Sequence, residues 1–267
     1  MIGMEYNKEV LALTDSVTIL GTRGSVPVSG SKYAKYGGAT SSYLVRLDGE
    51  TVVLDGGTGL LNLPEQFFSA PSLNLLLSHP HADHLHGLGV FPFRGTLSIY
   101  AKTRGGLSPE EQLLRYYSPP LWPVSPKAVY RELEERFTLG SIAVETAEGV
   151  HPGGVSLIKL SGGGKTVVYA SDTTLTGGSS LASFAADCDL LLCDGQFCRA
   201  ELSEKRGWGH SAWEDAAEAA RAAGARKLRI IHHSPTRTDS ELDAFSRKLQ
   251  SSGFDWAFAR EGEEVEL

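Results

Sequence analysis

Short apolar segments rich in β-branched residues recur along the chain and predict about ten strands. Polar or glycine-containing stretches separate them, as is typical of strands packed in layers. The predicted strands are 17–20, 42–47, 51–54, 73–77, 97–100, 142–144, 155–160, 166–169, 190–193 and 228–231.

Helical patterns predict helices at 58–68, 108–117, 212–223 and 238–251. The last three follow a hydroxyl residue with a glutamate three positions later, which is the pattern of a capping box. These hydroxyl residues are Ser108, Ser211 and Thr238. Gly224 and Gly253 are expected to end the helices after Ser211 and Thr238. The pattern favours sheets whose outer faces are covered by helices. Because we find neither linker nor repeat, we expect one domain over 1–267.

The 267 residues are 41% hydrophobic, which is ample for a buried core. Acidic residues outnumber basic ones by 32 to 25, giving a formal net charge of −7. This balance argues against a broad cationic surface and against extended nucleic-acid binding. A small anionic substrate stays compatible with it, because a metal ion can supply local positive charge.

No segment reaches the roughly 18 to 20 apolar residues of a membrane span, and the N-terminal residues carry charges where a signal peptide needs an apolar core. We therefore expect a cytoplasmic protein without membrane contact. Cys188, Cys193 and Cys198 fit neither a disulfide framework nor paired zinc-finger motifs. Reduced, partly buried thiols are expected.

Four of the eight histidines fall in one segment, 78–87, directly after the predicted strand 73–77. Residues two apart in an extended chain point to the same side, so His79 and His81 can bind one metal ion together. After the chain turns, Asp83 and His84 can hold a second ion beside it. His86 lies outside this spacing, and a supporting or surface role is expected for it.

The segment 78–84, SHPHADH, resembles the HxHxDH signature of the metallo-β-lactamase fold superfamily of dinuclear metal hydrolases. His151, Asp172 and His232 match further family positions in the same order along the chain. The resemblance spans roughly 17–245. It implies an α/β protein with a four-layer αββα sandwich, in which helices flank two mixed sheets.

Four other segments are similar to the phosphodiesterase branch of that superfamily, which includes tRNase Z, the cyclic phosphodiesterase of phosphonate breakdown and cyclic-nucleotide phosphodiesterase-like proteins. Ala39 departs from the asparagine common in that branch. The segments are 20–27 (LGTRGSVP), 36–42 (YGGATSS), 54–59 (LDGGTG) and 206–211 (RGWGHS).

The resemblance implies two divalent metal ions, with zinc preferred and manganese or iron as alternatives. Asp172 would bridge the two ions. The first ion would be bound by His79, His81 and His151, and the second by Asp83, His84 and His232. His233 competes with His232 for the last place, and we favour His232. A hydroxide held between the ions would attack the substrate.

Catalytic roles are expected for His210, Asp83 and Asp194. His210 would donate a proton to the leaving oxygen or bind the phosphoryl oxygens, next to a helix N-terminus at Ser211. Asp194 either orients His210 or is a turn residue at a strand end. Asp55 is expected to shape the floor of the site through hydrogen bonds.

The segment 116–123 combines three aromatic residues with three prolines. It either stacks a flat substrate group or forms a packed surface loop or dimer contact. We see no long lysine-rich arm of the kind with which tRNase Z binds tRNA.

The preferred function is therefore a dinuclear metal-dependent phosphodiesterase that acts on a small phosphodiester or a cyclic nucleotide. A homodimer is compatible with it. Two alternatives stay open: a hydrolase of a lactone, lactam or thioester, and a non-catalytic metal or cofactor carrier on the same fold.

Overall fold

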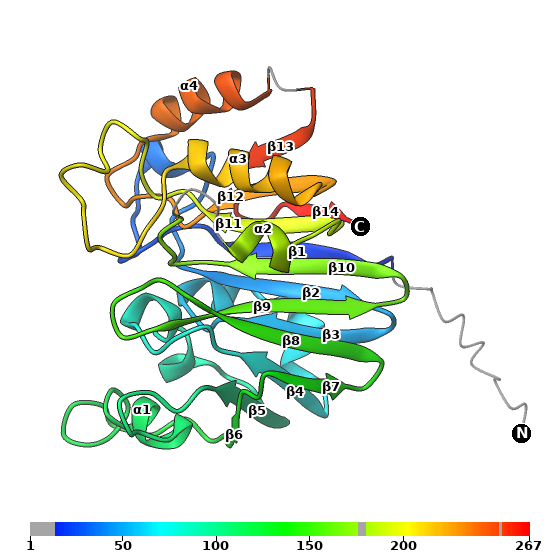
Figure 1. Ribbon diagram of the computed structural model, residues 1–267. Helices are drawn as coiled ribbons and strands as arrows, with labels where there is room; N and C mark the ends of the chain where they lie inside the picture. Colours follow the sequence, from blue (N-terminus) through cyan, green and yellow to red (C-terminus); the bar gives the residue numbers. More distant parts are fainter. Residues whose placement is uncertain (1–13, 176–179, 251–252) are drawn as a thin grey trace, which may run out of the picture.

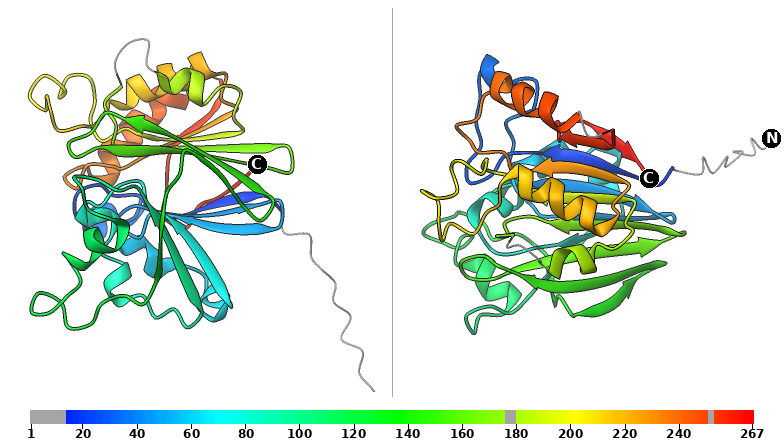
Figure 2. Two further views of the ribbon diagram at one scale, coloured as in Figure 1. Left: turned by 60° about the horizontal axis from the view of Figure 1, so that its bottom comes forward. Right: turned by 45° about the horizontal axis from the view of Figure 1, so that its top comes forward.

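The computed structural model describes residues 14–175, 180–250 and 253–267. Two mixed sheets, each of seven strands, are stacked as layers in this part of the chain (Figures 1 and 2). In order across it, the first sheet contains β14 (Glu264–Glu266), β1 (Ser16–Gly21), β2 (Ser42–Leu47), β3 (Glu50–Leu54), β4 (Ser72–Leu76), β5 (Thr96–Ala101) and β6 (Val129–Glu132). The second contains β13 (Asp255–Phe258), β12 (Lys227–Ile231), β11 (Leu190–Asp194), β10 (Lys165–Ala170), β9 (Val155–Gly162), β8 (Ile142–Gly149) and β7 (Arg136–Leu139).

Each sheet has an antiparallel part and a parallel part. Neighbouring strands are antiparallel from β14 to β3 and from β7 to β10. They are parallel from β3 to β6 and from β10 to β13. The carboxyl ends of parallel strands lie at one edge of a sheet, so the loops after them gather at the same edge.

Alternating side chains build the core between the two sheets. Tyr43 and Val45 of β2 and Val167 and Tyr169 of β10 belong to this inner cluster, whereas Val168 belongs to the outer face of the second sheet. Val167, Val168 and Tyr169 are all buried, so both faces of this strand are covered, which agrees with the short continuous apolar segments that predicted the strands.

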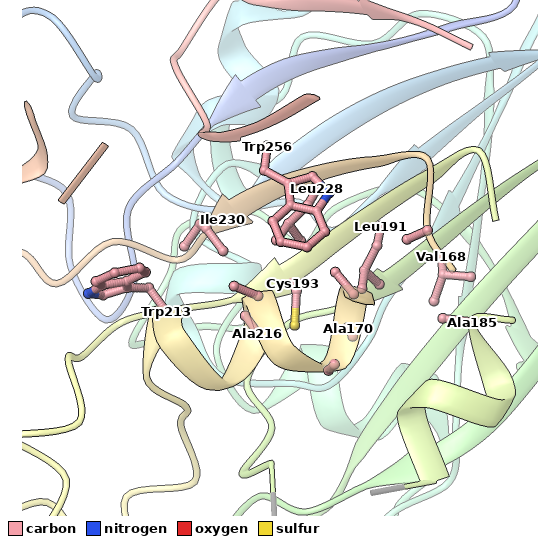
Figure 3. Close-up of a cluster of buried hydrophobic side chains, with 14 of the residues drawn as sticks. Val168, Ala170, Ala185, Leu191, Cys193, Trp213, Ala216, Leu228, Ile230 and Trp256 are labelled. Carbon is pink, nitrogen blue, oxygen red and sulfur yellow. The ribbon is translucent and has the colours of Figure 1, made fainter. Parts of the chain in front are cut away.

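Helices cover the outer face of the second sheet: α2 (Ser180–Phe184), α3 (Trp213–Ala223) and α4 (Asp239–Gln250). Figure 3 shows Trp213 and Ala216 of α3 over Cys193 and Ile230 of the sheet. The small alanine side chain lets the helix lie close to the strands. The three cysteines are free, as expected.

Short elements cover the outer face of the first sheet. Phe67, Phe91 and Trp122 pack there from the connecting segments. The architecture agrees with the predicted α/β sandwich of two mixed sheets flanked by helices. The remaining elements are η1 (Ser31–Tyr33), η2 (Thr58–Asn62), η3 (Glu65–Ser69), η4 (Ala82–His84), η5 (Leu88–Val90) and α1 (Pro109–Leu114).

All ten predicted strand segments form strands, but β6, β7, β13, β14 and the helix α2 were not predicted. The missed strands are short and lie at or next to sheet edges. Three of the four residues of β6 are exposed, so the strand lacks the apolar alternation that marks a half-buried one.

The prediction of one helix over 58–68 is wrong. Two 3₁₀-helices, η2 and η3, occupy the segment, with Leu63 and Pro64 between them. Pro64 cannot donate a backbone hydrogen bond, and it forces the residue before it out of the helical region. Leu63 accordingly has ψ 133°.

The helix starts differ in detail from the predicted capping boxes. Ser108 forms the complete box with Glu111 before α1, which ends at Leu114 rather than at 117. Thr238 hydrogen-bonds to Glu241 as expected, and α4 runs to Gln250, while 251 lies outside the described residues.

Ser211 is not the cap of α3. The N-cap is Ala212, and no side chain caps the helix. The Ser211 hydroxyl instead donates to the carbonyl of Thr173 (2.5 Å) and accepts from the amide of Leu175 (2.8 Å). Ser211 therefore connects the start of α3 to the loop that follows β10.

Candidate metal centre

The predicted ligands follow strands of both sheets at one edge of the molecule. His79 comes three residues after the end of β4, His151 two residues after β8, Asp172 two residues after β10, and His232 directly after β12. These strand ends lie on the left in Figure 1. The packing of the two sheets thus brings together residues that are far apart in the sequence.

Three site residues have a left-handed backbone, although none of them is glycine. The φ angles are 58° at Asp55, 50° at Asp172 and 60° at His232. This region costs a residue with a side chain roughly 1–2 kcal/mol. Strain of this kind persists where surrounding structure enforces it, and it is concentrated at functional sites.

The first group consists of His79, His81 and His151, whose candidate ligand atoms lie within 4.8 Å of one another. His151 Nε2 is 3.0 Å from His81 Nδ1, and His151 Nδ1 donates to the carbonyl of Gly209 (2.9 Å). At Gly209, φ is 85°, and a Cβ would lie 2.2 Å from His151 Nδ1. Only glycine fits there, so Gly209 fixes the ring of His151 with Nε2 toward the group.

The second group consists of Asp83, His84, Asp172 and His232, and all four residues are buried. His84 Nδ1 donates to Asp55 Oδ2 (2.6 Å), which leaves Nε2 3.4 Å from Asp83 Oδ2. Asp55 does shape the floor of the site as expected. It also accepts hydrogen bonds from Ser78 and from the hydroxyl of Tyr169.

Asp172 lies between the two groups and turns a different oxygen toward each. Oδ1 is 3.2 Å from His84 Nε2 and 3.1 Å from His232 Nδ1. Oδ2 is 3.7 Å from His79 Nε2 and 3.9 Å from His151 Nε2. A carboxylate in this position can serve both groups at once.

His233 points away from the cluster. Its Nε2 lies 2.9 Å from the carbonyl of Ala259, and its ring packs edge-on against Tyr36. His232 is the histidine that the structure places in the cluster. His86 is exposed and belongs to neither group.

The charges favour ionised carboxylates beside a neutral His79 and a protonated His84. Burial, followed by the charge of His84, holds the pKa of His79 well below its usual value. Burial raises the pKa of Asp172, but the charges of His232 and His84 outweigh it and hold that pKa well below the usual range. Burial lowers the pKa of His84, but Asp172, Asp83 and Asp55 outweigh it and raise that pKa well above normal. The carboxylates thus create a place for positive charge.

Metal ions fit these residues. The Nε2 atoms of His79, His84 and His232 are buried and have no hydrogen-bond partner. A buried polar atom left without a partner costs about 1–3 kcal/mol, and such atoms are rare in folded proteins. Divalent ions with imidazole and carboxylate ligands would satisfy all three nitrogens.

His210 lies beside this centre and pairs with Asp194. Its Nδ1 is 2.8 Å from Asp194 Oδ2 and 3.9 Å from Asp172 Oδ2. Burial lowers the pKa of His210, but the carboxylate of Asp194 outweighs burial and raises it. Asp194 also accepts hydrogen bonds from the backbone amides of Gln196 and Ser211. It therefore both closes a turn and positions His210. Asp172, Asp194, His210 and His232 form a third grouping of possible ligands.

The aromatic segment 116–123 packs against the loop that follows the histidine motif. The hydroxyl of Tyr117 donates to the carbonyl of Leu85 (2.7 Å), and Trp122 Nε1 donates to that of Gly89 (3.1 Å). The two rings contact each other edge to face. These aromatics are therefore engaged in packing, as in the surface-loop alternative.

Two contacts of the site were not predicted. The amide of Ser25 donates to Asp83 Oδ2 (2.6 Å), and Gln196 Nε2 donates to the Ser25 hydroxyl (3.1 Å). Ser25 lies in the segment 20–27, which is similar to the phosphodiesterase branch. That similarity is the one feature of the sequence that could have indicated a role for Ser25.

A family model described as the beta-lactamase superfamily domain matches residues 50–233. The chain belongs to this superfamily. Among its beta-lactamase superfamily relatives, the probable metallo-hydrolase YhfI of Bacillus subtilis is 23% identical over 90% of this chain and 98% of its own length. The ribonuclease Z of Treponema pallidum is 24% identical over 87% of this chain and 91% of its own.

Solved structures of the beta-lactamase superfamily have the same fold. YhfI from Bacillus subtilis superposes with a TM-score of 0.73 at 22% identity, over 95% of this chain and all of that one. A diphosphatase of the PhnP family gives 0.69 at 15% identity, over 94% and 97% of the two chains. Family, fold and ligand cluster together make this chain a metallo-hydrolase of the superfamily. Among its described residues, no helix has both the length and the apolar character needed to cross a membrane.

Proposed function

We propose that the chain is a dinuclear metal-dependent phosphodiesterase that acts on a small phosphodiester or a cyclic nucleotide. The observation that carries this proposal is the position of Asp172, whose two oxygens face two separate groups of ligating side chains. The relatives named ribonuclease Z and PhnP-family diphosphatase support phosphate ester chemistry.

In this proposal Asp172 would serve two divalent ions, of which zinc is preferred and manganese or iron are alternatives. His232 rather than His233 completes the second set, because His233 bonds to the backbone outside the cluster. The first ion would be held by His79, His81 and His151, and the second by Asp83, His84 and His232.

Bound ions would supply Lewis acidity, which activates water and offsets charge on the phosphoryl oxygens. His210 donates a proton to the leaving oxygen, because the carboxylate of Asp194 outweighs burial, raises the pKa of the imidazole and so favours its charged form. Asp194 orients the ring so that Nε2 faces the substrate. Asp83 stays ionised, because the charge of His84 outweighs burial and lowers its pKa, and it orients the attacking water.

The test is hydrolysis of bis(p-nitrophenyl) phosphate by chelated protein reloaded with zinc or with manganese. We expect metal-dependent release of p-nitrophenol and two ions per chain by elemental analysis. Asp172→Ala should lose both metal and turnover. His86→Ala, which removes an exposed histidine from the same motif, should retain both.

Absence of turnover in protein that holds two ions would contradict the proposal. It would direct attention to lactones, lactams and thioesters, or to a carrier role. Full metal content and full activity in Asp172→Ala would contradict the bridging role.

A further inference from the structure

A pocket opens directly beside His210, under the loop formed by residues 199–209. This loop is the yellow segment that precedes α3 in Figure 1. The pocket, called the loop pocket below, has a volume of about 300 Å³, the lower end of the range for small-molecule sites. Its walls include His210, Thr174, Leu175, Leu202, Lys205 and Arg206.

The base of this loop is fixed by charged residues that neutralise one another. Glu201 accepts two hydrogen bonds from Arg237 (2.7 and 2.6 Å) and one from the amide of Cys198 (2.8 Å). Arg199 pairs with Asp215 of α3 (2.6 Å). These charges have structural partners and are not available to a ligand.

The cations at the tip of the loop differ from those at its base. Within the described part of the chain, neither Lys205 nor Arg206 makes an ion pair, and Glu204 does not line the loop pocket. Lys205 Nζ lies 4.5 Å from the ring of Trp208, which holds its side chain in place. Two cations without carboxylate partners therefore border the loop pocket of a chain whose net charge is −7.

His210 belongs to both the loop pocket and the metal centre. Its Nδ1 lies 3.9 Å from Asp172 Oδ2, and its ring is a wall of the loop pocket. A phosphodiester placed at the metal centre would thus extend a neighbouring group past His210 into the loop pocket. Lys205 and Arg206 are the charged side chains that such a group meets there.

We propose that the loop pocket binds a second phosphate group of the substrate, so that the preferred substrates are small phosphodiesters carrying a further phosphate next to the cleaved linkage. This inference rests on the proposed phosphodiesterase function. Guanidinium and ammonium groups are the usual phosphate ligands of proteins, and Arg206 can bind two phosphate oxygens at once. The volume suits one such group, and the acidic chain lacks the charge for a long polyanion.

The first test compares thymidine 5′-(p-nitrophenyl phosphate) with the same ester carrying a 3′-phosphate, using manganese-loaded protein. We expect kcat/KM to be about tenfold higher for the 3′-phosphorylated ester, since hydrogen bonds between charged groups are stronger than those between neutral ones. The double variant Lys205→Ala/Arg206→Ala should bring the ratio of the two kcat/KM values close to one. Taking the ratio cancels any general loss of turnover.

The matched control is Arg131→Gln, which removes an exposed positive charge from β6 at the edge of the first sheet. It should keep the ratio of the parent. A ratio near one in the parent, or a tenfold ratio that survives the double variant, would overturn the inference.

A binding measurement separates this inference from the proposed function. Calorimetry should show that the manganese-loaded parent binds thymidine 3′,5′-bisphosphate about tenfold more tightly than thymidine 5′-monophosphate. The double variant should bind both alike. Failure of the parent to cleave either ester would overturn the phosphodiesterase proposal. The ratio of the two affinities would still show whether the loop pocket binds a second phosphate. Equal affinities, or no binding, in the parent would overturn the loop-pocket inference alone.

Discussion

Asp55 and Asp194 perform the same task in different sheets. Asp55 directly follows β3 and accepts from His84 Nδ1, while Asp194 ends β11 and pairs with His210 Nδ1. Each carboxylate pairs with Nδ1 of its histidine and thereby fixes the orientation of the ring. Single residues in this site therefore act largely through the orientation of a neighbouring histidine.

Replacing His210 tests its role as a proton donor separately from metal binding. We expect His210→Ala to lower kcat by about 10²–10⁴-fold, the usual contribution of a positioned acid, with metal content unchanged. Steady-state kinetics and elemental analysis on the same preparation check both. The loss should shrink for a substrate whose leaving group needs no proton, and an equal loss for all leaving groups would contradict the assignment.

The pairing of His210 with Asp194 predicts a pH effect. A raised pKa keeps His210 protonated, so kcat should fall as the pH rises through that pKa. Asp194→Asn removes the negative charge that raises it, so the alkaline limb of the pH profile should move to lower pH. An unchanged limb would show that His210 is not the group that titrates.

The strands in the middle of each sheet follow from the sequence, because burial on both faces demands continuous apolar residues. The edge strands do not, since exposed β6 is stabilised by pairing with β5 rather than by its own pattern.

Helix starts are likewise only partly predictable from the local sequence. Ser211 stands at the capping position of the sequence pattern, but its hydroxyl donates to the carbonyl of Thr173, which lies in a loop distant in the sequence.

Four ligand candidates were predictable because the motif at 78–84 places them at fixed spacing, and His151, Asp172 and His232 because they match family positions in the same order. Their supporting contacts were not, because they join residues that only the fold brings together. Tyr169 and Asp55, for example, are 114 positions apart. The sequence favoured His232 over His233 without excluding the latter, and the contact of His233 with Ala259 separates the two.

At the end of α3, Gly224 predicts a stability effect that is independent of the site. Its φ is 69°, and a Cβ would meet Asp187 Oδ1 at 2.9 Å. Gly224→Ala should lower the free energy of unfolding by about 1–2 kcal/mol, measured by urea denaturation. Gly224→Asn should lose less, because asparagine tolerates this backbone region better. Equal stability of all three proteins would contradict this account.

On the scale of the whole molecule, the candidate metal centre combines residues from both sheets. The loops after β4 supply His79, His81, Asp83 and His84, whereas those after β8, β10 and β12 supply His151, Asp172 and His232. Ions held by both sets would oppose separation of the sheets. Binding to the folded state alone also adds stability by mass action.

Removal of metal should therefore lower the melting temperature. At about 100 times the dissociation constant, bound metal contributes about 2.7 kcal/mol. Scanning calorimetry with and without chelator measures the shift. Asp172→Ala should melt at the same temperature with and without chelator. A parent protein whose melting temperature is unchanged by the chelator would contradict metal binding to the folded state.

The short connection between β6 and β7 is where the chain passes from the first sheet to the second, and Glu134 and Glu135 are exposed there. A cut between these two glutamates would give two fragments, each with an incomplete ligand set. The C-terminal fragment would also carry β14, which pairs with β1 of the other fragment. Recovery of high-affinity metal binding on mixing would thus report reassembly of the two halves.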